Sequence, residues 1–162
     1  MSRLESFIRR LEAQRACLDR AAQLIADLPG SVFELGLGNG RTFDHLRQEL
    51  PGRAIYVLER QVAAHPDCTP AAEFLILGDF RDTLPAACRR FAGSAALVHA
   101  DIGSGNDEAD HGLATALAPA IAALLREGGI AASDQPLPAP TLRELPLPPG
   151  VTPGRYRLYR KS

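Results

Sequence analysis

Apolar side chains follow two kinds of spacing along this chain, one typical of helices and the other of buried strands. From Leu4 to Ile25 they recur every three or four residues, which predicts a long amphipathic helix within residues 1–29. Ser2 and Glu5 have the form of a capping box at its start, and a Pro-Gly pair ends it. Short and almost uninterrupted apolar runs predict strands at residues 32–35, 54–58, 74–77, 95–101 and 130–134.

Two further helices are expected between these strands. Phe43, Leu46 and Leu50 have helical spacing, and a second Pro-Gly pair ends that helix. Apolar residues over 113–125 predict another helix, which a pair of glycines ends and which we expect Pro119 to kink or split.

The C-terminal part of the chain is rich in proline. Residues 136–154 predict an ordered but irregular loop that crosses the sheet, with one edge strand at residues 142–147. Residues 156–160 alternate and predict a final strand. Because strand and helix patterns alternate, we expect one α/β domain over residues 1–162. Its fold would be Rossmann-like and doubly wound, with a mostly parallel sheet of about six or seven strands and helices on both faces.

Composition agrees with a single globular domain. Hydrophobic residues make up 46% of the 162 positions and the net charge is −1, which argues against an extended nucleic-acid interface. The three cysteines Cys17, Cys68 and Cys88 lack metal-ligand spacing, so we expect reduced thiols. Charged residues interrupt the apolar N-terminus, and no apolar run is long enough to span a bilayer. We therefore expect a cytoplasmic protein.

Three alternating glycines follow the first predicted strand. Gly36, Gly38 and Gly40 let a ligand approach the backbone closely, which predicts a nucleotide-type cofactor site at this strand-to-helix turn. The dinucleotide fingerprint G-x-G-x-x-G would need its third glycine at Arg41, so a nicotinamide dehydrogenase is the weaker alternative. An ordinary strand-to-helix turn is the other interpretation of the motif.

Acidic residues stand at or near the carboxyl ends of all five predicted strands. They are Glu34, Glu59, Asp79, Asp101 and Asp134. Ligands of open parallel sheets bind beyond these strand ends, so the acids are expected to share one site. His99 precedes Asp101 by two residues and therefore lies on the same face of its strand.

The spacing E-x-G-x-G-x-G from Glu34 to Gly40 resembles the first motif of class I S-adenosylmethionine-dependent methyltransferases. The resemblance implies that S-adenosylmethionine is the cofactor and that the last strand is antiparallel. In this interpretation Glu59 accepts hydrogen bonds from the ribose hydroxyls and Asp79 from the adenine amino group. The residues expected at the cofactor are Glu34, Gly36, Leu37, Gly38, Asn39, Gly40, Thr42, Glu59, Arg60, Gly78, Asp79, Phe80 and Asp101.

Asp101 is the expected catalytic residue, as a base or as a group that orients the acceptor. His99 is the second candidate, and its other interpretation is a hydrogen-bonded core residue. Asp101 with Asp134 and Gln135 resembles the Asp and Asp-Asn set that holds a divalent cation in catechol and caffeoyl-coenzyme A O-methyltransferases. Gln135 departs from that pattern, so the presence of a metal stays open.

Four segments resemble a small bacterial group of compact class I methyltransferases. They are residues 13–19, 34–42, 99–105 and 133–137. We expect methyl transfer to a small-molecule acceptor, with S-adenosylhomocysteine as the product. The alternative is a cofactor-binding or sensing protein, because the chain has no separate substrate domain. Nucleic acid is the disfavoured partner, and the long apolar stripe of the first helix predicts a homo-oligomer.

Overall fold

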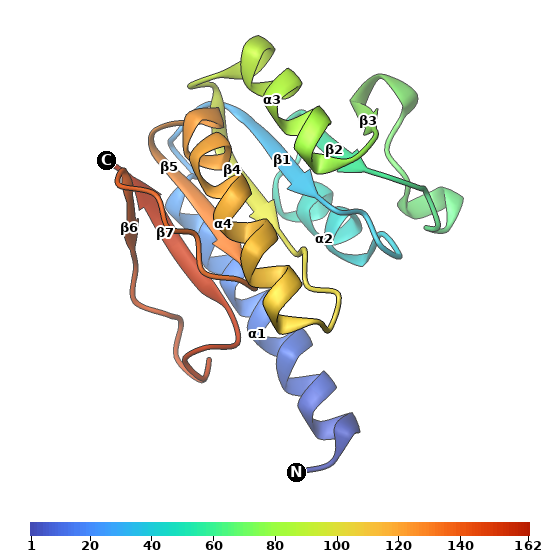
Figure 1. Cartoon of the computed structure of the whole chain (residues 1–162), viewed down its shortest axis with the longest axis vertical. Coiled ribbons are helices and arrows are strands. Elements are labelled where there is room, and N and C mark those ends of the chain that lie inside the picture. The colour runs from blue at the N-terminus through green and yellow to red at the C-terminus, as the bar shows by residue number, and fades with distance from the viewer.

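The computed structural model describes all 162 residues and contains a seven-stranded sheet between two pairs of helices (Figure 1). The strands are β1 (Ser31–Leu35), β2 (Ile55–Glu59), β3 (Leu75–Leu77), β4 (Ala95–Ala100), β5 (Leu125–Ser133), β6 (Leu142–Glu144) and β7 (Arg157–Lys161). The helices are α1 (Arg3–Leu24), α2 (Arg41–Glu49), α3 (Phe80–Phe91) and α4 (Asp107–Leu124), with short 3-10 turns η1 (Pro66–Cys68) and η2 (Ala72–Phe74). The sheet order β3-β2-β1-β4-β5-β7-β6 confirms the expected doubly wound fold.

The direction of the strands places the site. β1 to β5 are parallel, and β1 pairs with both β2 and β4, Phe33 lying opposite Tyr56 and Val98. β7 is antiparallel to β5, as expected, with Ala131 opposite Tyr159. The chain order reverses between β1 and β4, so a crevice opens beyond the carboxyl ends of these two strands.

Two apolar layers hold the helices to the sheet. α1 and α2 cover one face, where Leu18, Ile25 and Leu46 are fully buried. α3 and α4 cover the other face with Leu84 and Ile121, and Figure 1 shows this pair in front of the sheet. Burial of each side chain of this size contributes about 1.5–3 kcal/mol to the free energy of unfolding. The central strands are unbroken apolar runs because both of their faces are buried in this way.

The N-terminal half of α1 extends beyond the sheet (Figure 1). Its capping box is confirmed, since the Glu5 backbone N–H donates to Ser2 Oγ at 3.0 Å and Ser2 N–H donates to Glu5 Oε2 at 2.7 Å. The helix becomes buried from Ala13 onward, whereas Leu4 and Ile8 stay exposed. This projecting half lies within reach of the crevice.

Several boundaries differ from the sequence-based expectations. α4 begins at Asp107 and runs through Pro119 as one helix, so the expected split is wrong, and β5 begins five residues early, at Leu125. α3 has no counterpart among the helices expected from the sequence. The edge strand is limited to β6. No helix combines the length and apolar character that a membrane crossing needs.

Candidate active site

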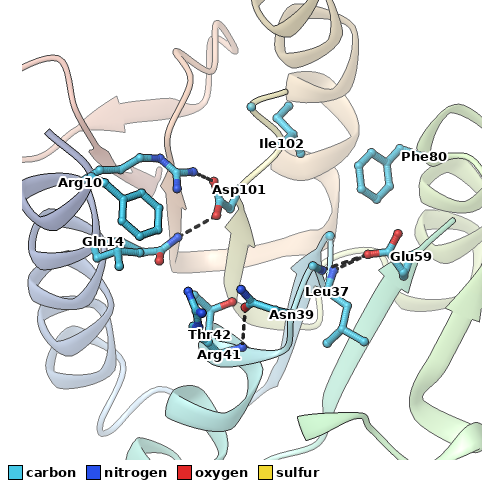
Figure 2. A pocket seen from close by; sticks show the side chains of 15 residues that line it. Arg10, Gln14, Leu37, Asn39, Arg41, Thr42, Glu59, Phe80, Asp101 and Ile102 are labelled. Carbon is cyan, nitrogen blue, oxygen red and sulfur yellow. Dashed lines mark hydrogen bonds and ion pairs between the residues drawn. The ribbon is translucent and has the colours of Figure 1, made fainter. Parts of the chain in front are cut away.

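A cavity of about 370 Å³ lies at the carboxyl ends of β1 and β4 (Figure 2). Its walls are the glycine loop, the segment after β4 and one face of α1, and its lining residues are Phe7, Arg10, Leu11, Gln14, Gly36, Leu37, Gly38, Asn39, Arg41, Thr42, Glu59, Phe80, Asp101, Ile102 and Gly103. A second hollow of about 370 Å³ adjoins it and shares Glu59, Phe80 and Ile102. The pair of hollows forms an extended site on both sides of Glu59.

The three glycines of the loop have different roles. All have positive φ, and a Cβ on Gly36 would come 3.1 Å from the carbonyl oxygen of Asp101. A Cβ on Gly38 would meet no protein atom within 4 Å, so this glycine faces open space in the cavity. A Cβ on Gly40 would clash with the Cys68 carbonyl oxygen. Gly40 is therefore required for packing, and it is not among the residues that line the cavity.

Glu59 ends β2 and is bound by the backbone of two loops (Figure 2). Its Oε2 accepts from Leu37 N–H at 2.7 Å and Gly38 N–H at 3.2 Å, and its Oε1 accepts from Arg60 N–H at 2.7 Å and Gln61 N–H at 3.2 Å. Burial raises the pKa of Glu59, but the four donors outweigh it and hold the pKa below its usual value of 4.5. The ionised carboxylate can exchange these donors for ligand hydroxyls.

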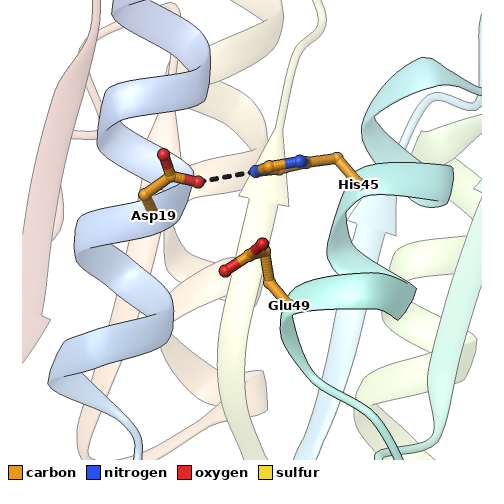
Figure 3. Close-up of side chains that lie close together, drawn as sticks. All are labelled: Asp19, His45 and Glu49. Atoms are coloured by element: carbon orange, nitrogen blue, oxygen red, sulfur yellow. Dashed lines mark hydrogen bonds and ion pairs between the residues drawn. The ribbon is translucent and has the colours of Figure 1, made fainter.

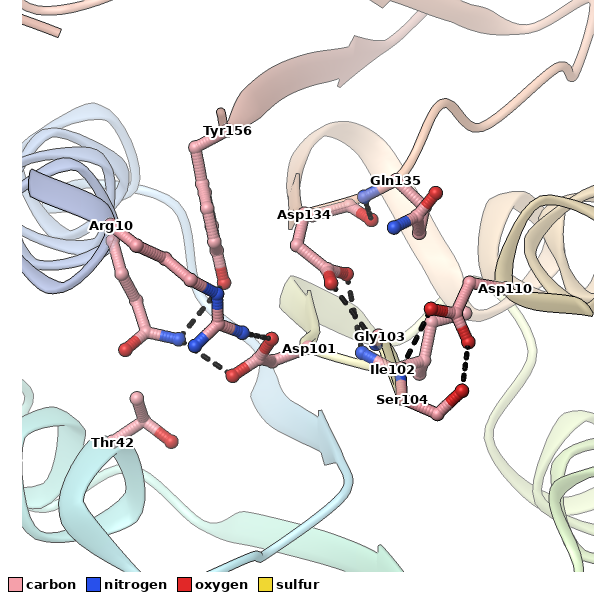
Figure 4. A network of polar contacts seen from close by, with 12 residues as sticks. Arg10, Thr42, Asp101, Ile102, Gly103, Ser104, Asp110, Asp134, Gln135 and Tyr156 are labelled. Atoms are coloured by element: carbon pink, nitrogen blue, oxygen red, sulfur yellow. Dashed lines mark hydrogen bonds and ion pairs between the residues drawn. The ribbon is translucent and has the colours of Figure 1, made fainter. Parts of the chain in front are cut away.

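Asp101, directly after β4, is held by two side chains of α1 (Figures 2 and 4). Arg10 Nη2 donates to Oδ1 at 2.6 Å, and Gln14 Nε2 donates to Oδ2 at 2.8 Å. Neither residue is among the site residues expected from the sequence. One signal was present, because Gln14 interrupts the apolar stripe formed by Leu11 and Leu18, which is typical of a buried polar contact.

A buried polar chain continues beneath the cavity. Gln14 Nε2 lies 3.3 Å from the Tyr156 hydroxyl, which hydrogen-bonds His99 Nε2. His99 Nδ1 lies 3.2 Å from Glu34 Oε1, and the Thr42 hydroxyl donates to the same oxygen. Gln14 can donate only to the oxygen of Tyr156, so the hydroxyl proton is free for His99 Nε2, and a proton on His99 Nδ1 would then be donated to Glu34.

This chain relocates two expected site residues. His99 and Glu34 are fully buried, and neither lines a hollow. Glu34 instead holds Thr42, which does line the cavity, and His99 bridges Glu34 to Tyr156. Both residues thus lie in the floor beneath the site rather than at its surface. The burial of so many hydrogen-bonded groups fixes the positions of Thr42 and Asp101.

The carboxylate of Asp134 is engaged by backbone N–H groups, whereas the side chain of Gln135 makes no hydrogen bond (Figure 4). Asp134 accepts from Ile102 N–H at 3.2 Å and Gly103 N–H at 3.0 Å, and the backbone N–H of Gln135 donates to Ser133 Oγ. Burial raises the pKa of Asp134, and the nearby charge of Asp101 raises it further. The acid therefore fastens the loop after β4.

The expected adenine-side residues gather at the second hollow. Arg60, Gly78, Asp79 and Phe80 line it. Asp79 also caps α3, since its Oδ1 accepts from Arg81 N–H at 2.9 Å. The two interpretations of Asp79, as a cap and as a lining residue, are therefore compatible, and Phe80 forms the wall common to both hollows.

Comparison with known proteins agrees with this architecture. A family model described as S-adenosyl-L-methionine methyltransferase matches residues 1–161. The crystal structure of an S-adenosyl-L-methionine methyl transferase from Silicibacter pomeroyi DSS-3 is 51% identical, with a TM-score of 0.96 over 100% of this chain and 99% of that one. No curated protein matches the chain.

More distant structures share only the fold. TrmN from Thermus thermophilus has a TM-score of 0.59 at 17% identity, over 89% of this chain and 48% of that one. The antibiotic-resistance methyltransferase Kmr has a TM-score of 0.56 at 12% identity, over 93% of this chain and 90% of that one.

The sheet order and the strand-end cavity define a class I methyltransferase fold. The chain belongs to the S-adenosyl-L-methionine methyltransferase family and is an S-adenosylmethionine-dependent methyltransferase. The open space above Gly38 and the ionised Glu59 fit this cofactor, because one admits a ligand against backbone and the other accepts hydroxyl donors.

Proposed function

We propose that this methyltransferase acts on a small-molecule acceptor that binds between α1 and Asp101. The observation that carries this proposal is the pair of hydrogen bonds from Arg10 and Gln14 to Asp101, which closes α1 over the cavity. Phe7 and Leu11 add an apolar wall on the same side. A macromolecular acceptor would have to displace this helix, whereas a small molecule would not.

The donor is proposed to occupy both hollows. Its methionyl part and ribose would lie against Gly36, Gly38 and Glu59, and its adenine would lie beside Asp79 and Phe80. When bound, S-adenosylmethionine supplies an electrophilic methyl group. The protein then needs mainly to align the acceptor with it. Asp101 is proposed to orient the acceptor and to take its proton, for which Arg10 must release one carboxylate oxygen.

A screen for S-adenosylhomocysteine release tests this proposal. Small hydroxyl, amine and carboxylic acid compounds are incubated with the donor and enzyme, and Asp101→Asn serves as the comparison. We expect at least one acceptor, and a kcat in the variant lower by about 100-fold, with S-adenosylhomocysteine affinity nearly unchanged. Donor binding without turnover for any compound would favour the alternative, a protein that senses the cofactor. Turnover on RNA alone would overturn the small-molecule assignment.

We also propose that a second copy of the chain covers the projecting half of α1. Leu4, Phe7 and Ile8 are 67%, 47% and 44% exposed and lie within two turns of α1, and Met1, just before the helix, is 74% exposed. Phe7 also lines the cavity, so a neighbour on this stripe would complete its mouth. Sedimentation should show a dimer or higher oligomer that Ile8→Glu dissociates and Arg9→Glu does not. A wild-type monomer at all micromolar concentrations would reject this assignment.

A further inference from the structure

Outside the cavity, three side chains gather where α1 meets α2: Asp19, His45 and Glu49 (Figure 3). His45 and Glu49 are four residues apart, so they share one face of α2. Nε2 of His45 lies 2.6 Å from Oδ1 of Asp19, and one ligand atom from each of the three residues lies within 4.8 Å of the others. No other group of three His, Cys, Asp or Glu side chains lies this close together.

We propose that this triad binds a divalent transition metal ion, best fitted by zinc, which fastens α1 to α2. An imidazole nitrogen with two carboxylate oxygens is a donor set that zinc accepts, whereas magnesium and calcium prefer oxygen alone. Two ligand atoms bound tetrahedrally to zinc lie about 3.4 Å apart. The distance from His45 Nε2 to Asp19 Oδ1, 2.6 Å, is shorter than that separation, and the 4.8 Å within which all three ligand atoms lie is longer. A change of rotamer in the exposed Glu49 would close the set.

The electrostatics and the accessibility of the triad favour a cation. Two carboxylates face one imidazole, so a neutral histidine leaves a double negative charge that a divalent ion would balance. Asp19 and His45 are partly exposed and Glu49 is exposed, so an ion can enter and water can take the fourth position.

The position of the triad connects it to the cavity walls. Asp19 follows Gln14 by five residues on α1, and His45 follows Thr42 by three residues on α2. Gln14 and Thr42 both line the cavity. An ion between the helices would therefore fix the distance between these walls and stabilise the folded chain, because it binds only when the two helices are docked.

Titration with ZnCl₂ tests the proposal directly. Protein freed of metal with EDTA and then dialysed is titrated by calorimetry, and its melting temperature is measured with and without the salt. We expect one ion per chain and a higher melting temperature. His45→Gln should weaken binding by at least about tenfold. His65→Gln is the matched control, because His65 also lies near an aspartate, Asp67 at 3.6 Å, but has no third ligand. His65→Gln should bind zinc as tightly as the wild type does.

Cysteine thiols are the competing zinc ligands, so Cys68→Ser should retain the full affinity. The proposal is overturned if the wild type binds no zinc at about 100 µM, or if His45→Gln binds as tightly. If His45→Gln fails to fold, Glu49→Gln changes only an exposed side chain and should show the same loss. MgCl₂ should give no shift in melting temperature. None of these measurements uses donor or acceptor, so their outcome is independent of the proposed methyl acceptor.

Discussion

Arg10 and Asp101 are 91 positions apart in the chain, yet Nη2 of Arg10 lies 2.6 Å from Oδ1 of Asp101. We expect the donor's sulfonium to lie between the glycine loop and Asp101, in the same cavity as this guanidinium. Arg10→Ala should remove this repulsion and favour S-adenosylmethionine over the neutral S-adenosylhomocysteine by about threefold to fivefold. Calorimetry with both ligands measures the ratio, and the exposed neighbour Arg9→Ala is the control. An equal change for both ligands would show that Arg10 lies away from the sulfur.

Glu59→Gln tests the proposed ribose contact. Charge-assisted hydrogen bonds contribute about 1.5–3 kcal/mol each, so S-adenosylhomocysteine affinity should fall by at least about tenfold. Circular dichroism should show an intact fold. Glu73→Gln replaces an exposed glutamate outside both hollows and should leave the affinity unchanged. If both variants bind equally well, the ribose lies elsewhere.

Gly38 and Gly52 provide a matched pair. Their φ values are +54° and +81°, and a Cβ on either would meet nothing within 4 Å, but only Gly38 lines the cavity. Replacement of either by Ala should cost about 1–2 kcal/mol of unfolding free energy, because both backbones are left-handed. Only Gly38→Ala should reduce S-adenosylhomocysteine affinity, by about tenfold. Equal affinity in the two variants would contradict the assigned donor position.

The sequence predicted the parallel sheet because its central strands are buried on both faces and therefore read as apolar runs. It did not predict α3, in which Pro85 and several charged residues obscure the helical spacing after Asp79. The strand-end positions of Glu59 and Asp101 were predictable, because a parallel sheet gathers its carboxyl ends. The contacts of Arg10 and Gln14 were not, since they depend on how α1 crosses the sheet. The same holds for His99, whose burial depends on Tyr156, the residue directly before β7.

Tyr156→Phe separates a structural role of the buried chain from a catalytic one. The lost hydroxyl leaves His99 and Gln14 without a buried partner, so the unfolding free energy should fall by about 1–3 kcal/mol. S-adenosylhomocysteine affinity should stay within about twofold. Tyr56→Phe, on a residue that stacks against Phe33, should change neither quantity. A loss of affinity with unchanged stability would place these buried hydrogen-bonded side chains in the binding site itself.

Asp134 should make stability depend on pH. Its folded-state pKa is raised by burial and by the charge of Asp101, so between the unfolded and folded values the native chain holds the proton that the unfolded chain has released. The free energy of unfolding contributed by this group therefore falls as the pH rises above about 4. Urea titrations at about pH 4 and about pH 7 should show the wild type losing stability relative to Asp134→Asn. Asp27→Asn, at an exposed site, should lose as much unfolding free energy between the two pH values as the wild type does. If Asp134→Asn also loses the same amount, the assignment of this pH dependence to Asp134 is wrong.

The hydrogen bond between Gln14 and Tyr156 joins residues 142 positions apart. During synthesis α1 leaves the ribosome long before β7, so Gln14 can reach Asp101 first and lacks its Tyr156 partner until the end of the sheet is made. Closing so long a loop costs entropy that only the completed packing repays. Nascent chains that lack β7 should therefore expose α1 and bind no donor. Donor binding would then report that β7 has been made and has joined the sheet.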